Sequence, residues 1–168
     1  MDALIRRATV GDAAGIAGVT VRGWQAGYAG LLPDAFLGSM SVADRADAWT
    51  EALRAPDPRS ATLVADLAGA VAGFAHTGTD GTRGELRALY VEPDRWRTGL
   101  GRALHDAALD AMRGKGFDVA TLWVLDTNIR GRQFYARLGW TPDGGQRAEP
   151  MGEIVLHVVR YTRPLTDR

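Results

Sequence analysis

Two glycines lie close together where an apolar segment gives way to a helical one. They are Gly99 and Gly101, in the stretch VEPDRWRTGLGR at 91–102. A helix that begins after a glycine-rich turn presents unpaired backbone N–H groups and the positive end of its dipole. Such a helix start binds phosphate, and glycine lets the phosphate approach the backbone closely. Arg97 and Arg102 flank the turn, which therefore predicts a phosphate site; a tight turn with packing glycines gives the same pattern.

Two well-known phosphate-binding motifs do not match this turn. A Walker P-loop requires GxxxxGK followed by Ser or Thr, and no such string occurs in the sequence. A dinucleotide-binding turn requires GxGxxG, and Leu104 stands where the third glycine should be. The glycines therefore need a different explanation.

Two longer segments carry a family resemblance. ELRALYVEPDRWRTGLGRALHDAALDAM (85–112) resembles motif A of the GNAT superfamily of acetyl-CoA-dependent N-acetyltransferases. DTNIRGRQFYARLGW (126–140) resembles motif B of the same superfamily, and the two motifs occur in the expected order. One position departs from the pattern, because Trp96 stands where the family often has Gln or Arg.

The resemblance implies acetyl-CoA as a co-substrate and assigns residues to it. The turn would hold the CoA pyrophosphate, mainly through backbone N–H groups, and the pantetheine arm would lie along the preceding strand. Asn128 would contact CoA, although it also suits the N-cap of the following helix. The residues expected to bind CoA are Leu89, Tyr90, Val91, Arg97, Thr98, Gly99, Leu100, Gly101, Arg102, Asn128 and Tyr135.

The resemblance also implies two catalytic residues, Glu85 as the base and Tyr135 as the acid that meets the CoA sulfur. Strand alternation puts Glu85 on the same face as Leu89 and Val91. From Glu85 to Val91 is roughly 20 Å, which suits a long thioester arm anchored at the turn. The alternatives are a solvated carboxylate at Glu85 and a packed aromatic at Tyr135.

The other ionisable candidates are three histidines. His76, His105 and His157 lie on different predicted elements, and no pair has the spacing of metal ligands, so we expect no metal site. All three are interpreted as structural, with His76 a weak alternative base. The chain has no cysteine, so a thioester-enzyme intermediate is excluded and direct transfer in a ternary complex is expected.

The acceptor is less well defined. Trp24, Tyr28 and Phe36 lie in the region that shapes acceptor sites in this superfamily, although each also suits a core helix. The segment 142–152, PDGGQRAEPMG, is expected to be a loop that closes over the acceptor. A small-molecule amine is favoured; amino acids, polyamines, aminoglycosides and protein N-termini stay open. A silent acyl-CoA-binding module is the rival function.

Composition limits the partners and the location. Twenty basic and twenty acidic side chains give no net charge, so nucleic acid and anionic membrane are not expected as partners. No apolar run reaches the length that spans a bilayer and the start MDALIRR lacks a secretory layout, so we expect a soluble protein of the cytoplasm.

The order of the expected elements predicts an α/β (α+β) fold in a single domain, 1–168. Strands are expected at 4–8, 61–65, 70–76, 85–91, 119–125 and 154–161, and helices at 12–24, 31–54 (one or two), 99–113 and 128–138. The resemblance implies a mixed, mostly antiparallel twisted sheet flanked by helices, with splayed central strands that bind CoA. A homodimer is expected, in which the last strand pairs with a neighbour's sheet edge.

Overall fold

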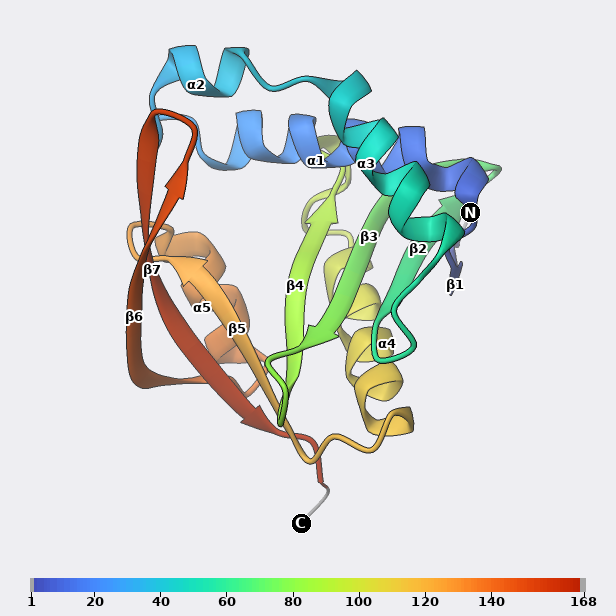
Figure 1. Ribbon diagram of the computed structural model, residues 1–168, viewed down its shortest axis with the longest axis vertical. Coiled ribbons are helices and arrows are strands. Elements are labelled where there is room, and N and C mark those ends of the chain that lie inside the picture. Colours follow the sequence, from blue (N-terminus) through green and yellow to red (C-terminus); the bar gives the residue numbers. More distant parts are fainter. Residues whose placement is uncertain (1, 167–168) are drawn as a thin grey trace.

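The computed structural model describes residues 2–166, and this part of the chain forms one seven-stranded sheet (Figure 1). The strand order is β1-β2-β3-β4-β5-β7-β6, and all neighbours are antiparallel except β4 and β5. The strands are β1 (Leu4–Arg7), β2 (Ala61–Leu67), β3 (Ala70–Thr79), β4 (Gly84–Val91), β5 (Val119–Leu125), β6 (Thr141–Met151) and β7 (Ile154–Pro164). The α-helices are α1 (Ala13–Gly27), α2 (Asp34–Gly38), α3 (Val42–Arg54), α4 (Leu100–Gly114) and α5 (Ile129–Arg137).

The parallel strands β4 and β5 are paired at one end only. Gly84 lies opposite Ala120 and Glu85 opposite Thr121, and beyond these two pairs the strands diverge (Figure 1). From Leu86 onward, the side of β4 that faces β5 therefore has no strand partner in the described chain. The expected splayed central strands and mostly antiparallel sheet are confirmed.

The helices cover both faces of the sheet. On one face, Ile16 and Val19 of α1 pack on Phe74 of β3, with α3 beside them. On the other face, Leu104 and Ala108 of α4 pack into the largest core cluster, which also takes in side chains from α5. Each face of the sheet therefore has its own apolar core, and the gap between β4 and β5 lies between the two helix layers.

One expected loop is a strand. Residues 142–152 were expected to close over the acceptor as a loop, but β6 spans Thr141–Met151 and pairs with β7. The PDGG sequence produces a break in the pairing register between Pro142 and Gln146, with Gly144 at φ +87°, and not a loop. Pairing with a long neighbour prevails over local turn preference here.

The last strand is an interior strand. β7 pairs with β5 on one side and with β6 on the other, so the expected dimer through a free edge of the last strand is wrong. β6 forms that edge of the sheet. Pro142 and Pro150 lie in it, and proline without an N–H is typical of edge strands.

Candidate active site

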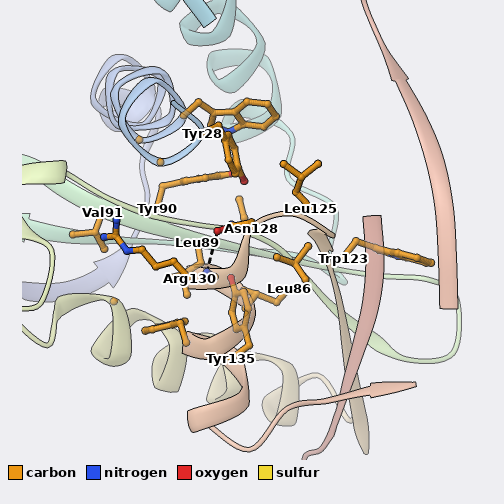
Figure 2. Close-up of a pocket in the computed structure, with 18 of the residues that line it drawn as sticks. Tyr28, Leu86, Leu89, Tyr90, Val91, Trp123, Leu125, Asn128, Arg130 and Tyr135 are labelled. Carbon is orange, nitrogen blue, oxygen red and sulfur yellow. Dashed lines mark hydrogen bonds between the residues drawn. The ribbon is translucent and has the colours of Figure 1, made fainter. Parts of the chain in front are cut away.

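A cavity of about 880 Å³ occupies the gap between the splayed strands (Figure 2). It runs from the turn before α4, past the free side of β4, to the hairpin formed by β6 and β7. We use "phosphate turn" for residues 95–102 and "hairpin end" for the part of the cavity lined by Trp24, Tyr28, Leu32, Trp123, Arg147, Glu149, Met151 and Leu156.

Two residues of the phosphate turn have left-handed backbone conformations. Arg97 has φ +64°, and Gly99, the N-cap of α4, has φ +89°. Gly101 is the second residue of α4 and needs no unusual φ. A Cβ there would lie 3.6 Å from Phe134, an ordinary contact, so packing within the protein does not require this glycine.

Most of the residues expected to bind CoA line the cavity. Two do not: Thr98, whose hydroxyl donates to the carbonyl of Arg95 at 2.6 Å, and Leu100, which packs into the core. Those that do are Leu89, Tyr90, Val91, Arg97, Gly99, Gly101, Arg102, Asn128 and Tyr135. The turn, the strand and α5 thus meet around one space.

Trp96 ties the phosphate turn to β4. Its indole N–H donates to the carbonyl oxygen of Val91 at 3.0 Å. The guanidinium of Arg130, from the first turn of α5, lies over the same indole ring, 3.9 Å from its centroid. Trp96, the residue that departs from the family pattern, therefore makes a cation–π contact with Arg130. Arg130 was not identified from the sequence.

Asn128 caps α5. Its side-chain oxygen accepts from the backbone N–H of Gly131 at 3.0 Å, the dashed line in Figure 2. A Cβ at position 131 would lie 2.5 Å from the Asn128 side-chain nitrogen, so any other residue there would displace the capping amide. The capping interpretation of Asn128 is confirmed, and the residue also lines the cavity.

A β-bulge changes the face on which Glu85 lies. His76 is opposite Ala88 but Thr77 is opposite Leu86, so Arg87 has no opposing residue. Leu86 packs with the α4 core despite lying three residues from Leu89. The expected shared face of Glu85, Leu89 and Val91 is therefore wrong: Glu85 lies on the face of Ala88 and Tyr90.

The carboxylate of Glu85 lines the cavity as half of an ion pair. Arg87 Nε lies 3.0 Å from it, and the Glu85 side chain is 16% exposed. His76 lies outside the lining, with Nδ1 2.9 Å from the Thr62 hydroxyl and the ring against Trp49. Burial and the nearby Arg87 lower the pKa of His76.

Three tyrosines point into the cavity from different elements. Tyr28 comes from the end of α1, Tyr90 from β4 and Tyr135 from α5, and Figure 2 shows Tyr135 reaching up from the opposite side to Tyr28. Burial raises the pKa of each phenol. All three stay protonated at neutral pH and can donate a proton or a hydrogen bond.

The expected acceptor residues separate into two groups. Trp24 and Tyr28 line the cavity, with ring centroids 4.8 Å apart in an edge-to-face contact. Phe36 lies in the same cluster, its ring 6.4 Å from that of Trp24, but outside the lining. The residue on α2 thus supports the wall without forming it.

Sequence reasoning missed the far wall of the hairpin end. Arg147 and Glu149 of β6 form an ion pair there, and the Arg147 guanidinium lies 4.1 Å from the centroid of Trp123 on β5. Treating 142–152 as a loop concealed the two-residue spacing of this pair. The alternation R-A-E-P-M was the signal that could have revealed a strand.

None of the helices between residues 2 and 166 has the length and apolar character of a membrane span. The same part of the chain contains no group of three His, Asp or Glu side chains arranged to hold a metal ion.

A protein-family sequence model covers the part of the chain that lines most of the cavity. The sequence model described as the Acetyltransferase (GNAT) family matches residues 24–140, which include the cavity-lining parts of α1, β4, the phosphate turn, β5 and α5. The chain belongs to the GNAT acetyltransferase family. It is accordingly an acyltransferase, as the motif resemblance predicted.

Individual relatives of this GNAT protein differ in how much they share with it. The N-acetyltransferase YuaI of Bacillus subtilis is 30% identical over 129 residues, 74% of this chain and 72% of YuaI. A mycothiol acetyltransferase of Beutenbergia cavernae is 44% identical over 63 residues, but these make up 38% of this chain and 21% of that enzyme. The chain therefore spans a small part of the mycothiol acetyltransferases it matches.

Solved structures agree in fold. The PaiA N-acetyltransferase of Thermoplasma acidophilum, solved with coenzyme A, superposes with a TM-score of 0.78 at 21% identity, covering 98% of this chain and 99% of PaiA. The yncA protein of Salmonella typhimurium, solved with its cofactor acetyl-CoA, gives 0.73 at 24% identity, covering 100% and 96%. At these identities the likeness shows that the GNAT fold is shared.

Proposed function

We propose that this GNAT protein transfers the acetyl group of acetyl-CoA directly to a primary amine in a ternary complex. The observation that carries the proposal is the cavity itself, which joins an anion-binding turn, a free strand side and two protonatable side chains. Its outline suits a long thioester with phosphates at one end and a reacting carbonyl at the other. The bound coenzyme A of the PaiA and yncA structures supports the same ligand.

The phosphate turn and β4 suit the two parts of this ligand. The N–H groups around Arg97 and Gly99 would bind the pyrophosphate, with charge from Arg102 and Arg130. The amide arm would pair with the side of β4 from Leu86 to Val91 that β5 leaves free. Thr98 and Leu100 would contribute backbone only, because their side chains do not line the cavity.

The transfer step needs one base and one acid. Glu85 would accept a proton from the ammonium so that the neutral amine attacks the thioester carbonyl. The neutral nitrogen would form the new C–N bond as the C–S bond breaks, and it would release its second proton to water. Tyr135 would give its proton to the departing sulfur and regain one from solvent. Burial raises the pKa of Tyr135, so the phenol still carries its proton when the reaction begins.

The rival is a silent acyl-CoA-binding module that would keep the phosphate turn but not turn over. Incubating acetyl-CoA with a library of primary amines and measuring released thiol separates the two. Thiol release that depends on an amine, together with the acetylated amine by mass spectrometry, supports the enzyme. Tight acetyl-CoA binding without turnover on any amine would contradict it. A homodimer and a cytoplasmic location stay predictions.

A further inference from the structure

The hairpin end of the cavity is largely apolar. Its walls come from α1 and the segment after it, from β5, and from the β6–β7 hairpin. Their apolar side chains are those of Trp24, Leu32, Trp123, Met151 and Leu156. An apolar group that leaves water for such a surface is stabilised by its burial, so this end of the cavity favours a hydrophobic ligand group.

Both carboxylates among the described lining residues are already neutralised. Glu85 pairs with Arg87, and Glu149 pairs with Arg147. Glu85 is the carboxylate that the reacting ammonium group would approach. A second ammonium group at the hairpin end would lose water beside Glu149, whose carboxylate is already paired with Arg147. Burying an uncompensated charge is strongly unfavourable.

The aromatic faces are occupied by cations as well. Arg147 and Arg160 lie over Trp123, with guanidinium carbons 4.1 and 5.4 Å from the ring centroid. Arg45 lies 5.9 Å from the centroid of Trp24. Aromatic rings attract ligand cations through their faces, and here arginines of the protein already use those faces.

We infer that the acceptor is a monoamine: one primary amine on an apolar or aromatic group, with no second positive charge. The inference rests on the proposed function and narrows its acceptor. The single ammonium group would approach Glu85, while the apolar remainder would fill the hairpin end. Polyamines and aminoglycosides, which carry several ammonium groups, would be poor ligands.

The test compares two amines of equal chain length, pentylamine and 1,5-diaminopentane, which differ in the second ammonium group. Calorimetry on the enzyme–CoA complex is expected to give at least about tenfold tighter binding of pentylamine, equivalent to about 1.4 kcal/mol. Equal or tighter binding of the diamine, or no binding of either, would overturn the inference. A monoamine preference without turnover in the thiol assay would overturn the proposed function alone.

Removing the internal cation provides a second arm. Arg147→Gln leaves the carboxylate of Glu149 without its ion-pair partner and is expected to reduce the preference for pentylamine at least about threefold by improving diamine binding. Arg54→Gln is the matched control, because Arg54 also pairs with a glutamate, Glu51, but lies outside the cavity lining. An unchanged preference in a folded Arg147→Gln protein would show that this pair does not exclude the second charge.

Discussion

Arg130 and Trp96 form a stacked pair at the mouth of the cavity, with the guanidinium carbon 3.9 Å from the indole centroid. Trp96 occupies the position where the family often has a polar side chain, and Arg130 reaches the same place from α5. The indole holds the cation in place through one face and donates to Val91 through its N–H. The polar group missing from the turn is thus supplied by another element.

Arg130→Gln is expected to raise the Kd for acetyl-CoA about tenfold, because a charge-assisted hydrogen bond contributes about 1.5–3 kcal/mol. The rate constant kcat at saturation should stay near that of the parent. Calorimetry at two salt concentrations checks this, since the loss should shrink as salt screens the charge. Arg59→Gln is the control, a stacked arginine over Phe117 outside the cavity lining. Equal affinities of the two variants for acetyl-CoA would show that Arg130 does not contribute to binding it.

Gly101→Ala is expected to separate stability from binding. The added methyl makes ordinary contacts within the protein, so the free energy of unfolding should stay the same or rise by up to about 1 kcal/mol. Gly101 also lines the cavity at the phosphate turn, so the same methyl would take space that the pyrophosphate needs. The affinity for acetyl-CoA should therefore fall at least about tenfold. Gly114→Ala at the other end of α4 has open space and controls for helix propensity. Normal CoA affinity in Gly101→Ala would show that the turn does not hold the phosphates.

Tyr135→Phe is expected to lower kcat at least about tenfold, a cautious value below the ~10²–10⁴-fold of a typical general acid. Acetyl-CoA affinity and melting temperature should stay close to those of the parent, because the ring is kept. Steady-state kinetics and calorimetry provide the two readouts. Tyr161→Phe is the matched control, because its hydroxyl accepts from Arg132 at 3.1 Å outside the cavity lining. Full turnover in Tyr135→Phe would show that the CoA thiolate departs without help from the Tyr135 hydroxyl.

Glu85→Gln is expected to lower kcat/KM about 10²-fold at neutral pH, because the amide cannot accept the proton of the ammonium. The amide has the same shape and can still contact Arg87, so the fold should be retained. The thiol-release assay with a turned-over amine measures the effect, with Glu51→Gln as an exposed, ion-paired control. Parent-like activity would assign the base role to a water molecule.

His105 is expected to make stability depend on pH. The indole N–H of Trp140 donates to its Nε2 at 2.8 Å, so the proton sits on Nδ1, 2.9 Å from Asp106. Burial lowers the pKa of His105 below its usual 6.5. The contribution of neutral His105 to the free energy of unfolding is therefore present above about pH 6.5. It is lost as pH falls through the pKa of His105 in the folded protein.

Thermal melts between about pH 5 and 8 check this prediction. The parent should lose stability toward acid, and His105→Gln, which cannot titrate, should lose less. His76 also has a lowered pKa, so part of the slope should remain in that variant. Identical slopes in the His105→Gln and parent proteins would contradict the assignment.

Local patterns in the sequence were sufficient for much of the fold. Strand 119–125 was placed at its observed bounds, and the helices near 99–113 and 128–138 within one residue, because their caps and apolar spacing are local signals. The strand at 141–151 was missed, since it depends on pairing with β7 and its own residues favour turns. Long-range pairing is not readable from such a segment.

The candidate site was also predicted only where it depends on residues close together in the sequence. The phosphate turn and Tyr135 follow from residues close together in sequence, and they line the cavity. The face of Glu85 was predicted wrongly because one bulge residue, Arg87, reverses the alternation. The position of Arg130 over Trp96 joins residues from two elements, and tertiary packing alone brings them together.

The divergence of β4 from β5 affects how well the backbone of the sheet is hydrogen-bonded. Six residues of β4, Leu86 to Val91, sit in the middle of a sheet yet have one ladder of hydrogen bonds where an interior strand has two. The backbone N–H and C=O groups of this segment that face β5 have no strand partner among the described residues, as in an edge strand. The sheet is therefore two smaller sheets, β1–β4 and β5–β7, fastened by two residue pairs at Gly84 and Glu85. A linear amide bound in that gap would act as the missing strand, so ligand binding would also complete the fold.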